Sequence, residues 1–559
     1  MVENDGHRDA LFSALPVLPL YLSNYIMPVG QLALAPSKSL HIHTMANFVN
    51  MPAPLLGKVY RLLGYRAAMT VATSVCQSWR VAADEYPFDE EEEVVLHDED
   101  SALRCVSSRT ALNAPPCMLL PAHSGMSVHR WLDSPSNPGR RLLRVRTNSQ
   151  GLLDNLLEKQ GDTPKLRSLV VEMPQGLEAA RVSHLTDLRT LHLDVVPFYT
   201  IPRIAALTRL KDLKLSCYGA DPGQLVHLSC LARLESLNLH HTLGVSDISF
   251  LSCLTRMSSL GLDRTEFPGD QLVHLVGLTC LQELDLANGT GLSDISPLSC
   301  LECLSVLILS DTAFPPDQSV HLSELTRLEI LYLGNNAQLS DASSLSRLER
   351  LTDLELSGTS VASDQLVHLS TFLPTIRFLD IGSTLVVDLM SLTVCREIEQ
   401  LRVSYTQVAD IGPLANCTKL DMLLCNDTLV SDLGPLSNCK KLSFIDGDNT
   451  PIQDLTALAS CTVLEHVSFN HTSVSSLTPL ASCPNLQHLS LDNTQVANLD
   501  ALQTGINLQH LSLDSTPVAH LGPLANCTKL EHLSLRNTLV TRLGADILRL
   551  PRLTRVDIR

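Results

Sequence analysis

The sequence predicts an α/β fold in which stacked repeats form a solenoid with one continuous, curved parallel β-sheet, preceded by a small helical module. Two observations support this prediction. A leucine-rich sequence motif recurs with a fixed period through the C-terminal part of the chain, where successive copies begin at Leu420, Leu442 and Leu464. In addition, 45% hydrophobic residues are combined with only 4% aromatic residues, so the repeat core is expected to consist mainly of leucine side chains. The 559 residues are enough for more than one domain.

The repeat has the form L-x-x-L-x-L-x-x-T-x-V-x-D-L-x-P-L-x-x-C-x-x in its clearest copies. This head, with a period between about 20 and 29 residues, is the signature of leucine-rich repeats. A degenerate first copy near Leu142 extends the predicted solenoid to 141–559. The 18 clear copies begin at Leu166, Leu188, Leu210, Leu234, Met257, Leu281, Leu304, Leu328, Leu351, Ile376, Ile398, Leu420, Leu442, Leu464, Leu486, Leu508, Leu530 and Leu553.

Within one repeat, positions 1, 4 and 6 should point inward and positions 3, 5, 7 and 8 outward, since side chains alternate along a strand. The apolar second half should return the chain in a short helical or 3₁₀ segment. No repeat can bury its apolar side alone, so the copies are expected to stack. A threonine at position 9 can bond the backbone of the turn through its hydroxyl. This threonine recurs as Thr359, Thr384, Thr406, Thr428, Thr450, Thr472, Thr494, Thr516 and Thr538.

The T-x-V-x-D-L-x-P-L motif resembles the short repeats of bacterial internalins and of a regulatory subunit of type-1 protein phosphatase. The resemblance covers the repeat region and implies a binding surface rather than a chemical reaction. The resemblance therefore implies the fold, and the partner has to be sought in other parts of the sequence.

The N-terminal residues 1–45 are expected to be a disordered or spurious extension, with a true start at Met45. A signal peptide is the alternative, because 10–22 is apolar and 33–35 resembles a cleavage site. The acidic residues Glu3, Asp5 and Asp9 and the late position of that site disfavour this alternative. The sequence has no uninterrupted apolar run of the roughly 18 residues that a membrane-spanning helix needs, so no span is expected.

Residues 46–88 predict a compact helical module, because Leu55, Leu56, Val59 and Leu63 recur on one helical face. This segment resembles an F-box, whose motif enters at a proline, continues as L-L-x-x-[IV]-x-x-x-L and closes on V-C-x-x-W. Met51 replaces the usual entry leucine, and a slightly longer stretch separates the two halves. A helical cap on the solenoid is the alternative. The matching residues are Pro52, Leu55, Leu56, Val59, Leu63, Val75, Cys76 and Trp79.

An F-box followed by leucine-rich repeats implies the substrate-recognition subunit of an SCF-type ubiquitin ligase in the cytoplasm, and also in the nucleus. The implied partners are a Skp-type adaptor with its cullin ligase core, and a target protein on the concave sheet. An acidic and proline-rich linker is expected at 89–140. The alternatives are a free-standing scaffold, such as a phosphatase-regulatory protein, and a secreted adhesion protein.

The outward positions are rich in aspartate and glutamate, so a target with a basic segment would be attracted to them. The net charge of −18 argues against nucleic acid as the partner. Five apolar side chains interrupt the acidic surface, and exposed apolar groups tend to mark interaction sites. We expect partner binding at Phe378, Tyr405, Met422, Leu424 and Phe444.

A histidine recurs at position 3 of four successive repeats, as His466, His488, His510 and His532. These side chains should form a ladder on the concave face and are included in the expected partner-binding surface. Metal binding or a pH-dependent contact is one alternative, and repeat copying alone can also explain the ladder. The cysteine that recurs three residues before a repeat head is expected to be a buried hydrophobe. No catalytic motif, cofactor fingerprint or metal-ligand spacing is apparent, so an enzyme, a cofactor and a metal are not expected.

Overall fold

The computed structural model describes residues 167–171, 179–219, 221–265, 267–289 and 291–558, together with three earlier strands, β1 (Glu93–Val95), β2 (Cys117–Leu120) and β3 (Arg144–Thr147). The chain divides into two compact units, 1–237 and 238–559. The F-box-like residues predicted from sequence lie outside the described residues. These are Pro52, Leu55, Leu56, Val59, Leu63, Val75, Cys76 and Trp79.

In the first unit the strands pair in parallel from β1 to β6. β1 and β2 fall within the range expected to be a linker, so parallel pairing begins earlier than the repeat pattern indicates. Short helical segments connect the later strands. The elements are β4 (Ser168–Val171), η5 (Ala179–His184), β5 (Thr190–Pro197), η6 (Phe198–Thr200), α9 (Ile201–Ile204), β6 (Asp212–Tyr218) and η7 (Pro222–Cys230), where η denotes a 3₁₀ helix.

In the second unit each described strand has three residues, and from β8 to β21 each pairs in parallel with the next. β7 (Ser236–Asn238) spans the boundary between the units. The others are β8 (Ser259–Gly261), β9 (Glu283–Asp285), β10 (Val306–Ile308), β11 (Ile330–Tyr332), β12 (Asp353–Glu355), β13 (Phe378–Asp380), β14 (Gln400–Arg402), β15 (Met422–Leu424), β16 (Phe444–Asp446), β17 (His466–Ser468), β18 (His488–Ser490), β19 (His510–Ser512), β20 (His532–Ser534) and β21 (Arg555–Asp557).

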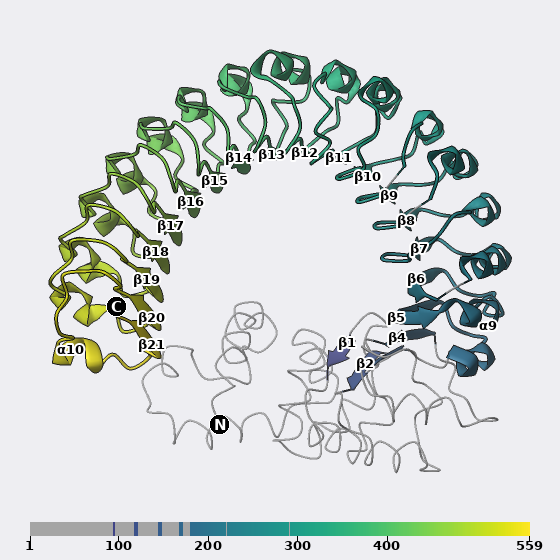
Figure 1. Ribbon diagram of the computed structural model, residues 1–559, viewed down its shortest axis with the longest axis horizontal. Coiled ribbons are helices and arrows are strands. Elements are labelled where there is room, and N and C mark those ends of the chain that lie inside the picture. Colours follow the sequence, from purple (N-terminus) through teal and green to yellow (C-terminus); the bar gives the residue numbers. More distant parts are fainter. Residues whose placement is uncertain are drawn as a thin grey trace, which may run out of the picture. The chain divides into compact units, whose positions relative to one another are not determined.

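A 3₁₀ segment follows most strands, as predicted, and lies on the outer side of the curve that the second unit forms (Figure 1). The strands line the inner side of this curve. The segments are η8 (Ser249–Cys253), η9 (Gly269–Leu275), η10 (Ser296–Cys300), η11 (Pro316–Glu324), η12 (Ser343–Arg347), η13 (Ser363–Leu369), η14 (Met390–Val394), η15 (Gly412–Asn416), η16 (Gly434–Asn438), η17 (Thr456–Ser460), η18 (Thr478–Ser482), η19 (Asp500–Thr504), η20 (Gly522–Asn526) and the helix α10 (Ala545–Leu548).

The core lies between the strands and the 3₁₀ segments and is formed by columns of equivalent apolar residues. Leu420, Leu423 and Leu436 are fully buried, and their equivalents in neighbouring coils are buried in the same way. The predicted threonine contact is confirmed: Thr406 Oγ1 donates to the carbonyl of Val403 over 2.6 Å, and the bond recurs along the array. Each repeat is therefore one coil held to its neighbours by apolar columns.

The recurring cysteine before the repeat head is buried, as predicted. Cys417 Sγ donates to the carbonyl of Cys395 in the preceding coil over 3.0 Å, and Cys439 donates to Cys417 in the same way over 3.4 Å. Burial raises the pKa of the Cys395, Cys417 and Cys439 thiols to about 12. These thiols therefore act as small apolar side chains of the core.

Candidate functional site

The inner face of the second unit carries one row of position-3 side chains that changes from apolar to histidine. In β15–β20 the register places these residues side by side, because each strand pairs with the next without a shift. In chain order the row is Met422, Phe444, His466, His488, His510 and His532.

The rings of this row stack on one another. Phe444 and His466 have centroids 5.3 Å apart with an interplanar angle of 22°. His466 and His488 lie 4.3 Å apart, His488 and His510 lie 4.5 Å apart, and both pairs are tilted by only 9°. His532 is turned by 75° from His510 at 6.1 Å. The predicted ladder is therefore a continuous aromatic stack that ends at His532.

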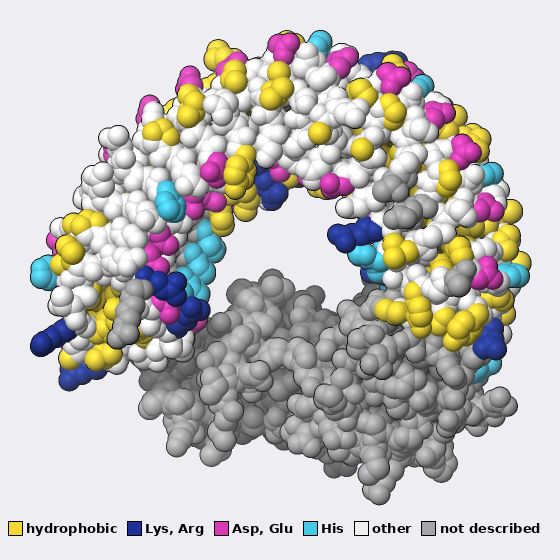
Figure 2. All heavy atoms as spheres, in the orientation of Figure 1, with side chains coloured by type: hydrophobic (Ala, Val, Ile, Leu, Met, Phe, Trp, Pro, Cys, Tyr) yellow, Lys and Arg dark blue, Asp and Glu magenta, His cyan; other side chains and the backbone are white. Residues whose placement is uncertain are grey.

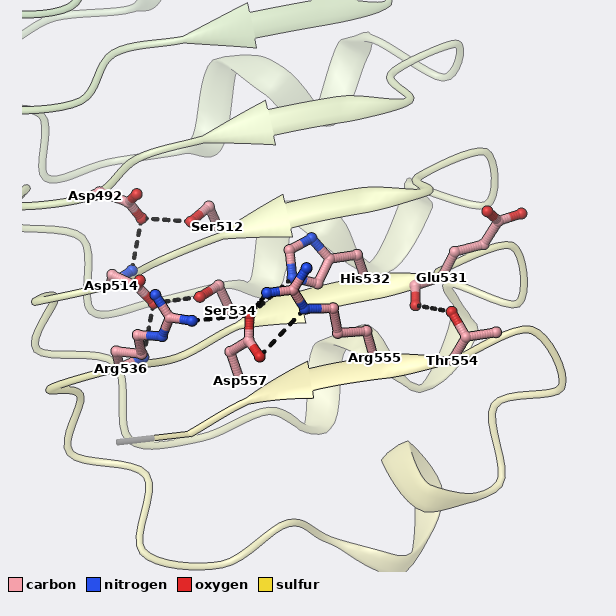
Figure 3. Close-up of polar contacts among 10 residues, drawn as sticks. All are labelled: Asp492, Ser512, Asp514, Glu531, His532, Ser534, Arg536, Thr554, Arg555 and Asp557. Atoms are coloured by element: carbon pink, nitrogen blue, oxygen red, sulfur yellow. Dashed lines mark hydrogen bonds and ion pairs between the residues drawn. The ribbon is translucent and has the colours of Figure 1, made fainter.

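His532 leaves the stack because its ring bonds to a different strand. Its Nε2 lies 3.2 Å from Asp557 Oδ2, which also receives Arg536 Nη2 at 3.3 Å and Arg555 Nη2 at 3.0 Å (Figure 3). The hydrogen bonds from His532 and Arg555 lower the pKa of the Asp557 carboxyl. This cluster fixes the end of the aromatic row.

A shallow hollow of about 230 Å³ lies over the stack. We call it the histidine groove and define it by Phe444, His466, His488, His510 and His532, which line it together with Ser468, Ser490 and Ser512. Figure 2 shows histidine side chains gathered on this inner face beside acidic side chains. The groove therefore offers flat aromatic surface within a polar surrounding.

A second ladder runs beside the groove at positions 5 and 7. Asp492 Oδ1 accepts hydrogen bonds from Ser512 Oγ at 2.7 Å and from the backbone N–H of Asp514 at 2.7 Å, both in the next coil (Figure 3). Asp514 accepts from Ser534 and from the N–H of Arg536 in the same way. Asp448 and Asn470 form the preceding steps. We call this the serine–aspartate ladder.

The predictions from sequence miss this ladder, because they treat its aspartates as free surface charge. A recurring signal for it exists: a serine at position 5 and an aspartate or asparagine at position 7, repeated from one copy to the next. The donors to Asp492 and Asp514 described above are hydroxyls and amides. Their hydrogen bonds therefore hold the carboxylates in place without cancelling their negative charge.

Two groups on the strands of the groove, β16 and β18, have shifted pKa values. Burial, with the nearby Asp448 carboxylate, raises the pKa of Asp446 to about 6, although the backbone N–H of Asp448 donates to it. Burial and the neighbouring His466 and His510 rings lower the pKa of His488. Both shifts favour the neutral form of the side chain.

The five apolar residues expected to bind a partner, called here the apolar patch, lie on β13, β15 and β16 and in the turn after β14. Gln400 and Arg402 of β14 separate Phe378 from Met422 and Leu424 in the register of the sheet. Tyr405 lies beyond the end of β14, in a turn with φ of 59°, and is 62% exposed. Phe378, Met422, Leu424 and Phe444 lie on the strands as expected and are half-buried. The patch is therefore divided into two neighbouring surfaces.

Phe378 belongs to a second hollow of about 500 Å³. The guanidinium of Arg402 lies over the Phe378 ring at 5.1 Å, and Tyr332 meets that ring edge-on at 6.1 Å. Asp353, Glu355 and Glu399 also line this hollow. Because Arg402 already covers the ring, this surface offers less free aromatic area than the histidine groove.

The part of the chain that the structure describes contains no evident metal site. No group of three histidine, cysteine, aspartate or glutamate side chains there is arranged to hold a metal ion. No helix among the same residues has the length and apolar character needed to span a membrane.

Comparison with known proteins agrees with the repeat architecture. Residues 462–504 match the family model for leucine-rich repeats in two copies. An internalin from Listeria monocytogenes is similar at 24% sequence identity and a TM-score of 0.50, covering 56% of this chain and 88% of that one. A leucine-rich repeat protein of Leptospira interrogans is similar at 17% identity and a TM-score of 0.57, covering 69% of this chain and 99% of that one. No match was found among curated proteins.

These similarities and the stacked coils agree on one fold. The chain carries leucine-rich repeats, and its described coils form an open solenoid with a long parallel sheet and 3₁₀ turns. The predicted fold class is confirmed for this region.

Proposed function

We propose that the chain is a non-catalytic, protein-binding solenoid whose histidine groove takes up a segment of a target protein. The observation that supports this is the stack of Phe444 with His466, His488 and His510 on the inner face. Solvent-accessible aromatic surface is a common anchor of specific protein interfaces. A solenoid also presents a long concave surface on which a partner can lie.

The target segment is expected to carry lysine or arginine next to an apolar side chain. Asp492 and Asp514 lie beside the groove, and their hydroxyl and amide partners do not cancel their negative charges. The whole chain has a net charge of −18. Such a field attracts a basic segment, while the aromatic stack can pack against the apolar side chain.

The second part of the proposal is that the solenoid serves as the substrate-recognition subunit of an SCF-type ubiquitin ligase. This part is supported by the F-box-like sequence motif in residues 46–88, which ends with Val75, Cys76 and Trp79. In this role the N-terminal module binds a Skp-type adaptor and its cullin core, and the groove binds the protein to be modified. The corresponding location is the cytoplasm, and also the nucleus.

Affinity purification of the full-length chain, followed by mass spectrometry, tests the class of function. Adaptor and cullin peptides support the ligase role, whereas a phosphatase catalytic subunit in their place would support the scaffold alternative. A target found in the same experiment is then titrated against groove variants.

The groove itself is tested with Phe444→Ala. Loss of one aromatic anchor commonly costs about 2 kcal/mol of binding, roughly a 30-fold weaker Kd. The matched control is Tyr199→Ala, because Tyr199 is exposed and does not line the groove. Leu423→Ala in the core should instead destabilise the fold by about 2–5 kcal/mol. Unchanged affinity of Phe444→Ala, or unfolding like that of Leu423→Ala, would contradict a binding role for this ring.

A further inference from the structure

Two accessible thiols occupy equivalent places on consecutive coils of the second unit. Cys280 and Cys303 each stand directly before a repeat head, at Leu281 and Leu304. Cys280 is exposed and Cys303 is half-buried. In both turns the amide of the head leucine donates to the carbonyl three residues before it, over 2.9 and 3.0 Å. The two turns therefore have the same local hydrogen bonding.

The strands that follow fix how these two turns lie. Glu283 of β9 pairs with Val306 of β10. Cys280 stands three residues before Glu283, and Cys303 stands three residues before Val306, so the cysteines share the register of the strands. The amide of Ser305 donates to the carbonyl of Gln282 over 2.8 Å, so pairing has already begun two residues after each cysteine. The turns consequently stack in register, and Figure 1 shows β9 and β10 as adjacent strands.

Register brings the two cysteines to a distance that a disulfide can span. Adjacent paired strands lie about 4.8 Å apart, and disulfide-linked cysteines have Cα atoms about 4.4–6.8 Å apart. Equivalent positions on stacked coils also direct their side chains to the same side. Bond formation then requires rotation of the two side chains.

An arginine side chain contacts one member of this pair. Arg327 occupies the equivalent position of the next coil, and its Nη1 lies 3.6 Å from Cys303 Sγ. Arg256 occupies that position in the preceding coil and is exposed. The buried thiols Cys395 and Cys417 differ from this pair in accessibility, because they lie in the core.

We propose that Cys280 and Cys303 form a reversible dithiol–disulfide pair across two coils, with a low-molecular-weight disulfide as the oxidant. The Cys303 thiolate attacks one sulfur of the external disulfide, forming a mixed disulfide and releasing one thiolate. The Cys280 thiolate then attacks Cys303 Sγ and releases the second. The protein loses two electrons and two protons, and the external disulfide becomes two thiols.

Oxidation would fasten the coil of β9 to the coil of β10. Apart from the backbone that connects them, neighbouring coils of a solenoid are held together by non-covalent contacts. The covalent link would therefore oppose local opening at this point of the array, and reduction would release it. This inference is independent of the partner proposed for the histidine groove.

The test uses the full-length chain incubated with oxidised glutathione, blocked with an alkylating reagent and digested at glutamate. Cleavage after Glu266, Glu283, Glu302 and Glu324 places Cys280, Cys300 and Cys303 on three separate peptides. Mass spectrometry without reductant should show peptides 267–283 and 303–324 joined, and separate after reduction. Cys303→Ser should abolish the joined species.

Cys300→Ser is the matched control, because Cys300 is exposed three residues from Cys303 but lies on η10. It should leave the joined peptides unchanged. A link between Cys300 and Cys303 would overturn the proposal. So would stable glutathione adducts on both Cys280 and Cys303 with no joined species.

Discussion

Three aspartates around β16 have different surroundings although they lie only a few residues apart. Asp454 accepts hydrogen bonds from the hydroxyl and the backbone N–H of Thr456, which lower the pKa of its carboxyl. Asp448 accepts from Ser468 and Asn470 of the next coil. Asp446 accepts from a backbone N–H at 3.1 Å, and burial raises its pKa to about 6. The Asp454 carboxylate therefore stabilises its turn, whereas the buried Asp446 carboxylate destabilises the fold when it is ionised.

Replacing Asp446 with asparagine should stabilise the protein at neutral pH. The folded pKa of about 6 exceeds the ordinary 3.8, so the charged carboxylate is disfavoured in the fold above pH 6. Asparagine keeps an oxygen for the backbone N–H and removes the charge. We expect a gain of about 1 kcal/mol at pH 7.5, falling toward zero below about pH 3, where both states of the wild type are protonated. Urea unfolding at both pH values measures it. An equal gain at both would contradict this explanation.

At the scale of the element, the coil determines which side chains meet. Each strand of three residues presents positions 3 and 5 on the inner face, and the unshifted register repeats them in rows. Histidine at position 3 thus stacks on histidine, and serine at position 5 meets the aspartate of the preceding coil. The close parallel rings also mean that neighbouring imidazoles cannot all be protonated without repulsion.

The His488 ring should make stability depend on pH. Burial and the flanking His466 and His510 lower its folded pKa below the ordinary 6.5. Because the unfolded state then binds the proton more readily, this contribution is present above pH 6.5 and is lost as the pH falls through the folded pKa. His488→Gln should remove it, so the variant should lose less stability than wild type between pH 7.5 and 5. Thermal unfolding of both proteins across this range is the measurement. His520→Gln, outside the groove, is the control and should follow wild type.

Much of the fold and of the candidate site could be predicted from the sequence, because a fixed repeat length determines the register of the strands as well as the fold. The repeat correctly predicts the hydrogen bond of the recurring threonine, the burial of the recurring cysteine and the ladder formed by the recurring histidine. It could not show that the Arg402 guanidinium lies over the Phe378 ring, because this depends on the conformation of a long side chain. Nor could it show that Tyr405 lies in a turn beyond its strand.

At the scale of the whole molecule, the proposed function needs two separable parts. The coils interact mainly with adjacent coils, so a change in the N-terminal segment should leave the solenoid folded. The F-box resemblance assigns adaptor binding to that segment, whereas the aromatic stack supports target binding by the solenoid.

Replacing Val75 and Trp79 with alanine should therefore abolish co-purification of a Skp-type adaptor. Apolar side chains at such a contact commonly contribute about 2 kcal/mol or more each. The circular dichroism of the solenoid should remain as in wild type, and target binding at the groove should persist. Adaptor binding at wild-type strength in the double variant would contradict the F-box role.

The serine–aspartate ladder has a direction, since each acceptor side chain from Asp448 to Asp514 bonds to the coil that follows it. At Arg536 the run stops, because an arginine side chain has no acceptor to offer and instead reaches Asp557. An inserted copy of one whole repeat would bring a serine hydroxyl and a backbone N–H as donors and an aspartate or asparagine as acceptor. The ladder would therefore continue on both sides of the insertion. Gene duplication can thus lengthen this array by whole repeats while every ladder residue keeps its hydrogen-bond partner. An insertion of part of a repeat would interrupt the ladder.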